Sequence, residues 1–339
     1  MAVGGGSPVT MSDVARLAGV STTTVSRVVN GRYGVSASTI AQVRSAIERL
    51  GYESSLVASS LRRRKTDVLG LVTHSFQSYT AEVLKGVMDA LRQTGLDLII
   101  YADSDLYGTY AAGWEQRHLS RLAGTLTDGC IVVTPSGEIR SSTPVVAIDP
   151  ATDSTVPSVT AANFEGATAV VEHLIELGHR RIGFIAGRSE LVASRSREEG
   201  YLQALARAGI PADPALIAKG DFHPGPAAPL ARALLERPDR PTAIFAANDD
   251  MALTTLEVAR DLGLSVPGDL SVAGFDDIPE AALAEPALTT VDQSVYRLGY
   301  EAARMLKALV RGEWDGPHQI VLPARLIVRR STAPPRAAM

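Results

Sequence analysis

The 339-residue sequence is poor in cysteine and aromatic residues, and it has no apolar run long enough to span a membrane. Cys130 is the one cysteine, which excludes an internal disulfide and a zinc site made of several thiolates. No stretch approaches the roughly 20 apolar residues of a transmembrane helix, and the N-terminus lacks the basic-then-apolar order of a signal peptide. We therefore expect a cytoplasmic protein without a membrane partner, in which Cys130 is a buried structural thiol.

Motifs of catalysis are also missing. The six histidines show no metal-ligand spacing, and there is no Gly-x-Ser-x-Gly elbow, phosphate-binding glycine loop or catalytic triad motif. Asp249-Asp250 and Asp276-Asp277 could be imagined as paired catalytic carboxylates, but both pairs open predicted helices or turns, where aspartates are common. We expect no enzyme activity, no cofactor and no metal.

The charge is unevenly distributed along a chain that is long enough for two or three domains. Residues 1–65 hold nine Lys or Arg and three Asp or Glu, a net charge of +6, so that the remainder carries −10 of the total of −4. A small basic segment on an acidic body indicates that only this segment meets a polyanion. Chance surface charge is the alternative.

Residues 10–53 have the pattern of three short helices. A hydroxyl residue that can cap the helix precedes each one and a glycine follows it: Thr10 and Gly19, Ser21 and Gly31, Ser36 and Gly51. The first two helices meet at Ala18-Gly19-Val20-Ser21, which is typical of a helix-turn-helix. The second helix of such a motif, here residues 22–30, enters the major groove of DNA.

The outward face of this second helix is polar. It carries Thr22, Thr23, Ser26 and Arg27, and hydroxyl and guanidinium groups suit base edges and phosphates. A core helix would bury apolar groups here, and a catalytic site would need a stronger acid or base. The face therefore predicts contact with double-stranded DNA.

The run D-V-A-R-L-A-G-V-S over 13–21, followed by T-V-S-R-V-V-N-G over 24–31, resembles the lac/galactose repressor family of transcriptional regulators. The resemblance extends from Thr10 to about Pro334. It implies that Thr22 and Thr23 read operator bases and that Arg27 is a base-contacting arginine. Ser21, Thr24 and Asn30 fall at positions that hold phosphates.

Residues 54–66 match the family's hinge helix, which is thought to order only on operator DNA. The resemblance places Ala58 and Leu61 in the DNA contact, with Leu61 as a wedge in the minor groove, and an apolar wedge that kinks DNA is a known device. One or two helical turns are too short to persist alone. The alternative is an ordinary linker in which Leu61 touches the larger domain. The basic run at 62–65 adds phosphate contacts or is a solvated linker.

From residue 67 onward, short apolar runs alternate with amphipathic helices. The predicted strands cover 68–72, 96–100, 129–133, 181–186, 243–246 and 270–274. Apolar strands separated by helices indicate parallel sheets covered on both faces, so we expect an α/β body of two doubly wound lobes. Ligands of such sheets bind at the carboxyl ends of the strands, here between the lobes. Residues 1–9 and the tail 331–339 are expected to be loose ends.

The body also carries signatures similar to the family's ligand-binding and dimerisation domain, predicted over 67–330. They lie at 178–185, 247–249, 272–277 and 288–291. This domain resembles periplasmic sugar-binding proteins, which implies that the chain crosses between the lobes near 160–163, 290–293 and 322–326.

Arg197, Asn248 and Asp276 match positions that contact the effector in sugar-responsive relatives, and Phe222 matches an aromatic that stacks on it. A guanidinium, an amide and a carboxylate together can hold vicinal hydroxyls. Each has a plainer alternative. Asp276 could cap a turn and Asn248 a helix, whereas Arg197 could lie on the surface and Phe222 in the core.

The first-lobe part of the expected pocket departs from the family pattern. The family usually has Asp, Asn and a Pro-Phe-Phe run after the first strand, where this chain has H-S-F-Q-S-Y-T over 74–80. Ala162 stands directly before Asn163, where the family often has an Asp. Tyr79 and Phe76 are the candidates for aromatic contact. Arg195 is expected to support a contact between lobes or subunits.

These patterns predict a homodimeric repressor that binds a palindromic operator, since a twofold dimer matches a palindrome. A small effector, a sugar or sugar derivative, is expected to release the repressor from the operator. The tail has no leucine heptads, so no helical tetramer extension is expected. Two alternatives stay open: a periplasmic-type sugar sensor without a DNA role, and a ligand-independent DNA-binding regulator with a degenerate pocket.

Overall fold

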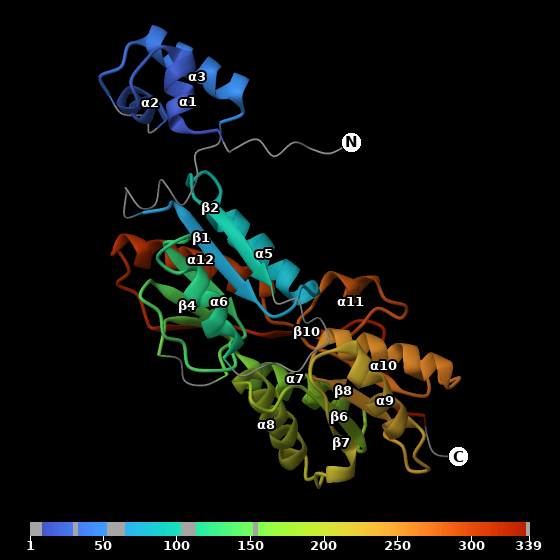
Figure 1. The fold of residues 1–339 in the computed structure, drawn as a ribbon. Coiled ribbons are helices and arrows are strands. Elements are labelled where there is room, and N and C mark those ends of the chain that lie inside the picture. The colour runs from blue at the N-terminus through green and yellow to red at the C-terminus, as the bar shows by residue number, and fades with distance from the viewer. Residues whose placement is uncertain (1–8, 30–32, 53–64, 103–112, 152–154, 337–339) are drawn as a thin grey trace. The chain divides into compact units, whose positions relative to one another are not determined.

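The computed structural model describes residues 9–29, 33–52, 65–102, 113–151 and 155–336. The chain divides into two compact units, Met1–Thr66 and Asp67–Met339, each of which is described by itself (Figure 1). None of the described helices is long and apolar enough to cross a membrane.

The smaller unit is a three-helix head of α1 (Met11–Ala18), α2 (Thr22–Val29) and α3 (Ala37–Leu50). Its first helix begins with a capping box, in which Thr10 Oγ1 accepts from the Asp13 amide at 3.3 Å and Asp13 Oδ2 accepts from the Thr10 amide at 3.0 Å. The helices pack on a small buried core formed by Val14, Ala15, Val25, Val43 and Ala46. Val25 on the inner side of α2 fixes which face of that helix is turned outward.

The first lobe of the larger unit is a six-stranded parallel sheet in the order β11-β5-β4-β3-β1-β2. Its strands are β1 (Val68–Thr73), β2 (Asp97–Ala102), β3 (Gly129–Val133), β4 (Val145–Ile148), β5 (Ser158–Ala161) and β11 (Gln319–Leu322). Its helices are α5 (Ser78–Leu91), α6 (Trp114–Leu122) and α12 (Val295–Arg311). Side chains alternate along a strand, so Leu69 and Leu71 pack with α5 and α12, whereas Val72 packs with α6.

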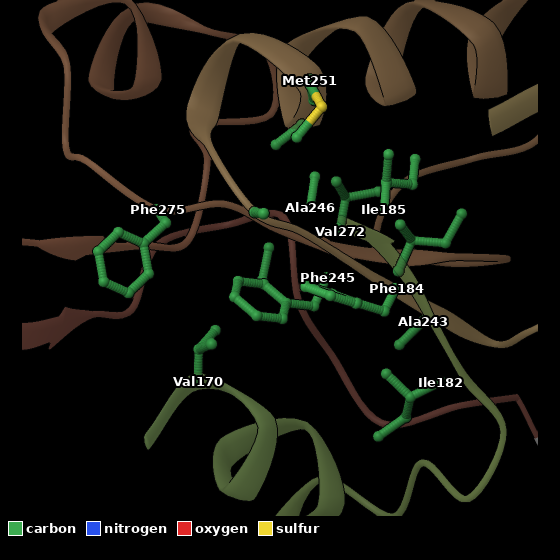
Figure 2. Close-up of a cluster of buried hydrophobic side chains, with 14 of the residues drawn as sticks. Val170, Ile182, Phe184, Ile185, Ala243, Phe245, Ala246, Met251, Val272 and Phe275 are labelled. Carbon is green, nitrogen blue, oxygen red and sulfur yellow. The ribbon is translucent and has the colours of Figure 1, made fainter. Parts of the chain in front are cut away.

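The second lobe is a four-stranded parallel sheet in the order β7-β6-β8-β9. The strands are β6 (Ile182–Ala186), β7 (Ile217–Lys219), β8 (Ala243–Ala246) and β9 (Ser271–Ala273). The helices are α7 (Asn163–Glu176), α8 (Val192–Arg207), α9 (Pro224–Leu235), α10 (Asp249–Asp261) and α11 (Pro279–Leu283), with a 3-10 turn at Pro214–Leu216. Figure 2 shows Val170 of α7 and Met251 of α10 approaching the strands from opposite faces, with Ile185 and Phe245 between them.

Three segments join the two lobes. The chain leaves the first sheet after β5 and enters α7, returns through β10 (Thr290–Asp292) to α12, and leaves again from β11 to β12 (Arg325–Ile327). Strands β10 and β12 pair antiparallel, with Thr290 opposite Ile327 and Asp292 opposite Arg325. The larger unit therefore has the two parallel-sheet lobes that the apolar runs predict.

Two features differ from the sequence-based expectation. Strand β2 is the edge of its sheet, and its residues are half-buried or exposed rather than fully buried as in β1, β3 and β4. The expected loose tail is wrong at its start. Ser331 is fully buried, and its hydroxyl donates to the Val272 carbonyl at 2.6 Å, while the Ala333 amide donates to Ser271 Oγ at 3.0 Å. This segment lies along β9, whose edge would otherwise leave backbone groups unpaired.

Candidate functional site

Helix α2 of the head turns a polar face outward. Thr22, Thr23 and Arg27 are exposed, Ser26 is half-buried, and Val25 lies in the core behind them. Exposed hydroxyls and a guanidinium on the N-terminal part of one helix can reach base edges and phosphates. The head therefore has the groups that its predicted role requires on the accessible side.

Ser21 and Thr24 form the cap of this helix. The Ser21 hydroxyl accepts from the Thr24 amide at 3.1 Å and lies 2.9 Å from the Thr24 hydroxyl. Both side chains thus have a structural partner in addition to the predicted phosphate contact. The other predicted DNA contacts, Asn30, Ala58 and Leu61, lie outside the described residues.

The larger unit contains a small cavity of about 80 Å³ between its lobes. The first lobe lines it with Thr73, His74, Ser75, Gln77, Tyr79, Thr80, Val133, Thr134 and Asp149, and the second with Arg188, Leu191, Arg197, Phe222, Asn248 and Asp276. The lining includes all five side chains that the sequence singled out as ligand contacts. Phe76, the other aromatic candidate, precedes α5, is 52% exposed and is not among the lining residues, whereas Tyr79 and Thr80 in the first turn of that helix are.

Arg197 is the centre of a buried hydrogen-bond network rather than a surface arginine. Its Nε donates to Asn163 Oδ1 at 2.9 Å, and its Nη2 to Gln293 Oε1 at 3.3 Å. Its Nη1 donates to the Ala247 carbonyl and, at 3.3 Å, to Asp276 Oδ1. Asn163 and Gln293 belong to two of the three crossings between the lobes, so Arg197 connects the cavity to the segments that join them.

Asp276 is held in this network at the carboxyl end of β9. Besides Arg197, the Gln293 amide donates to its Oδ1. Burial raises the pKa of Asp276 to about 7, although Arg197 opposes the shift. The group is therefore part carboxylic acid and part carboxylate near neutral pH, and it can donate or accept a hydrogen bond.

Asn248 caps a helix and also lines the cavity, so the two interpretations of this residue do not exclude each other. Its Oδ1 accepts from the Met251 amide at 3.1 Å, which caps α10, and its Nδ2 donates to the Phe222 carbonyl at 3.1 Å. The Phe222 ring centroid is 5.7 Å from the Arg197 guanidinium carbon. Phe222 therefore sits against the cavity rather than deep in the core.

Tyr79 faces a carboxylate that the sequence did not single out. The Tyr79 hydroxyl donates to Asp149 Oδ2 at 2.8 Å, and Thr160 donates to Asp149 Oδ1 at 2.5 Å. Burial and the neighbouring Asp149 raise the pKa of Tyr79 well above its ordinary value, so the phenol stays protonated. Asp149 and Thr134 directly follow apolar strands, and that position was the signal that could have identified them.

Backbone strain gathers around this cavity. Eight described non-glycine residues have positive φ, and four of them line it: Thr134 (46°), Asp149 (46°), Phe222 (73°) and Asp276 (123°). Such conformations cost about 1–3 kcal/mol each and persist mainly where surrounding structure holds them, often at functional sites. Their concentration here supports a functional cavity.

Polar contacts bridge the two lobes beside the cavity. The Gln77 amide nitrogen donates to His223 Nδ1 at 2.6 Å, and the Ser78 hydroxyl donates to Glu280 Oε1 at 3.0 Å. Burial lowers the pKa of His223, which keeps Nδ1 available as an acceptor. Arg195 Nη2 donates to the Ala151 carbonyl of the first lobe at 3.2 Å, so Arg195 supports a contact between lobes. Within the described ranges, no three His, Cys, Asp or Glu side chains gather in a way that could hold a metal ion.

Two family models match the chain. Residues 10–55 match "bacterial regulatory proteins, lacI family", and residues 171–332 match the "periplasmic binding protein-like domain". The first match covers the described helices of the head, and the second covers most of the second lobe together with the segment of the first lobe that returns through α12.

Similar proteins and structures extend over nearly the whole chain. Catabolite control protein A of Priestia megaterium is 34% identical over 96% of this chain and 99% of its own, and the HTH-type transcriptional repressor PurR of Pectobacterium atrosepticum is 36% identical over 96% and 97%. A structure of the lac repressor dimer bound to operator and the anti-inducer ONPF covers 96% of this chain and 99% of its own, with 28% identity and a TM-score of 0.80. A complex of the transcriptional regulator CelR with cellobiose covers 95% and 99%, with 34% identity and a TM-score of 0.70.

Proposed function

The chain belongs to the lacI family of bacterial regulatory proteins, and on that premise we propose that it represses transcription by binding a palindromic operator as a homodimer. A sugar or sugar derivative that enters the cavity of the larger unit releases the protein from the operator. Its relatives are transcription regulators, among them PurR repressors and the lac repressor. We extend the proposal to a cytoplasmic protein without enzyme activity.

One observation carries this proposal: the chain combines an exposed polar recognition helix with a cavity that gathers Tyr79, Arg197, Phe222, Asn248 and Asp276. A periplasmic-type sensor would have no use for the first feature. A regulator with a degenerate pocket would have no reason to keep a strained, fully buried polar network around the second.

The Arg197 network suggests how the cavity can act on the rest of the molecule. A ligand that exchanges hydrogen bonds with Asp276 or Arg197 competes with Asn163 and Gln293, which lie where the chain crosses between the lobes. Ligand entry thereby changes the relation between the lobes. A coupling of about 1–3 kcal/mol, or roughly 5–150-fold in operator affinity, is ordinary for such linked sites.

The test separates the two roles by mutation. A palindrome is selected from random DNA, and operator binding is followed by fluorescence anisotropy at fixed salt, with and without mono- and disaccharides, nucleosides and sugar phosphates. Arg27→Ala should weaken binding to the selected operator by about 1–3 kcal/mol, and Arg49→Ala, an exposed arginine of α3, should weaken it far less. Asn248→Ala should raise at least about tenfold the concentration of the active compound that releases the operator.

Equal losses for Arg27→Ala and Arg49→Ala would contradict the assignment of α2 as the reading helix. Release at an unchanged concentration in Asn248→Ala would contradict the assignment of the cavity.

A further inference from the structure

Gly187 directly follows β6 and lies against the aromatic ring of Phe222. A Cβ atom on Gly187 would be 2.0 Å from Cζ of that ring and 2.4 Å from both Cε1 and Cε2. Because three ring carbons come this close at once, the face of the ring lies over the glycine. Gly187 does not have the positive φ that favours glycine, so this position needs glycine for the close approach of the ring.

The ring of Phe222 stands between Gly187 and the cavity. Phe222 lines the cavity, whereas Gly187 is buried and is not among the lining residues. The guanidinium carbon of Arg197, which also lines the cavity, is 5.7 Å from the ring centroid. The ring is therefore part of the cavity wall, and the glycine lies directly behind that wall.

The backbone that carries this ring is held in place. Phe222 has a φ of 73°, and a non-glycine residue keeps such a conformation mainly where its surroundings enforce it. Its carbonyl accepts from Asn248 Nδ2 at 3.1 Å, and Asp221 Oδ1 accepts from the next amide, that of His223, at 2.9 Å. A change at Gly187 would therefore be taken up by movement of the Phe222 ring about its side-chain torsions.

The direction and size of that movement follow from the contacts. Carbon atoms of packed side chains stay about 3.5–4.0 Å apart, so a Cβ at 2.0 Å would push the ring about 1.5 Å away from Gly187 and toward the cavity. The cavity of about 80 Å³ corresponds to roughly five to eight water positions, at about 10–15 Å³ for each. An aromatic ring that advances this far fills much of the space.

We propose that Gly187 is a positioning residue of the effector site, which seats the Phe222 ring against β6 and so keeps the cavity open. The inference rests on the proposed function and adds to its site a residue that does not touch the effector. A side chain at position 187 yields a folded protein whose own Phe222 occupies the cavity and which responds poorly to effector.

A double-mutant cycle in the operator assay tests this role. The probes are glucose, galactose, fructose, ribose, cellobiose and glucose 6-phosphate, and the compound that releases the natural protein at the lowest concentration is followed. The variants are Gly187→Ala, Phe222→Ala and the two combined. Gly225→Ala is the control, because a Cβ at this position of α9 meets open space. Far-ultraviolet circular dichroism establishes that each variant is folded.

Gly187→Ala should raise the concentration for half-release about tenfold or more when Phe222 is present, since residues in direct contact are strongly coupled. In the Phe222→Ala background the same change should raise it less than about twofold, because no ring remains to be displaced. Gly225→Ala should leave the concentration unchanged. An equal rise in both backgrounds, no rise at all, or a Gly187→Ala protein that does not fold would overturn the inference.

Crystal structures of the natural protein and of Gly187→Ala separate this outcome from the function proposed above. A Phe222 ring that has moved about 1 Å or more toward Arg197 supports the inference even where none of the six compounds releases the operator, a result that would count against the release mechanism alone. A ring that stays in place while the backbone of Gly187 shifts would overturn the inference and leave the release mechanism standing.

Discussion

Replacement of Asp276 by asparagine should change how the stability of the protein depends on pH. Asp276 is fully buried beside Arg197 and Gln293, and burial raises its pKa from 3.8 to about 7. Asparagine keeps the side-chain oxygen that accepts from Arg197 and Gln293 but cannot ionise. The substitution therefore removes the ionisation of this carboxyl group while keeping its acceptor oxygen.

The sign and size follow from proton linkage. The folded state holds the Asp276 proton more tightly than the unfolded state, so its contribution to stability is fully present below about pH 4 and is lost as the pH rises through about 7. Each pKa unit is worth about 1.36 kcal/mol. Between pH 5 and pH 8 the natural protein should therefore lose about 3 kcal/mol of unfolding free energy relative to Asp276→Asn.

The assay is urea unfolding followed by far-ultraviolet circular dichroism at pH 5, 6, 7 and 8. Burial and, after it, the neighbouring Asp276 raise the pKa of Asp249, so Asp276→Asn also changes the titration of Asp249, and the comparison is repeated in an Asp249→Asn background to separate the two groups. Asp239→Asn is the control, because hydrogen bonds from Arg237 lower the pKa of that exposed carboxyl and its ionisation is complete throughout this range. A stability difference between the natural protein and Asp276→Asn that does not change with pH would refute the reasoning.

Three further predictions concern packing, the network and assembly. A Cβ on Gly86 would lie 1.9 Å from the Tyr296 carbonyl oxygen, so Gly86→Ala should separate α5 from α12 and destabilise the protein by about 1–3 kcal/mol. Gly225 has open space around it, so Gly225→Ala should not destabilise the protein in this way. Thermal unfolding measures both variants, and equal melting points would contradict the close packing of α5 and α12. Arg197→Met leaves Asp276 buried without its ion pair and should lower the free energy of unfolding by about 3–5 kcal/mol at pH 8, compared with less than about 1 kcal/mol for Arg207→Met, which removes an exposed arginine paired with Glu172. Urea unfolding measures both losses, and losses of similar size would contradict the buried network. Leu283 is 83% exposed beside a groove that Leu253, Leu256 and Leu264 line, and we expect this apolar surface to belong to the dimer interface. Leu283→Asp should then shift the dimer toward monomer in light scattering, whereas Val321→Asp, which removes another exposed apolar side chain, should leave the dimer intact. A dimer that persists in Leu283→Asp would exclude this groove as an interface.

Local chemistry made the head and the strands predictable. Thr10 and Ser36 accept from the amides three residues on, and Gly19 and Gly51 adopt the left-handed conformation that ends a helix. These features depend only on neighbouring residues. The apolar runs likewise marked the buried strands, since a strand covered on both faces must be apolar throughout.

The cavity was predictable only in part. Resemblance to the family indicated Arg197, Asn248 and Asp276, but Asp149 and Arg188 were missed because their significance depends on which strand ends meet between the lobes. The anchoring of Ser331 was missed for a similar reason. Its partners Val272 and Thr289 are far away in the sequence, and no local pattern near the two prolines that follow it reveals them.

Operator affinity with and without effector tests the proposed repressor most directly. The full chain is bound to its selected palindrome at fixed salt, and the dissociation constant is measured by fluorescence anisotropy against the panel of neutral and charged sugars. We expect at least one compound to weaken operator binding about tenfold or more, a coupling within the usual range for linked sites. Tight binding that no compound alters would contradict the role of the cavity, and failure to select any palindrome would contradict the repressor itself.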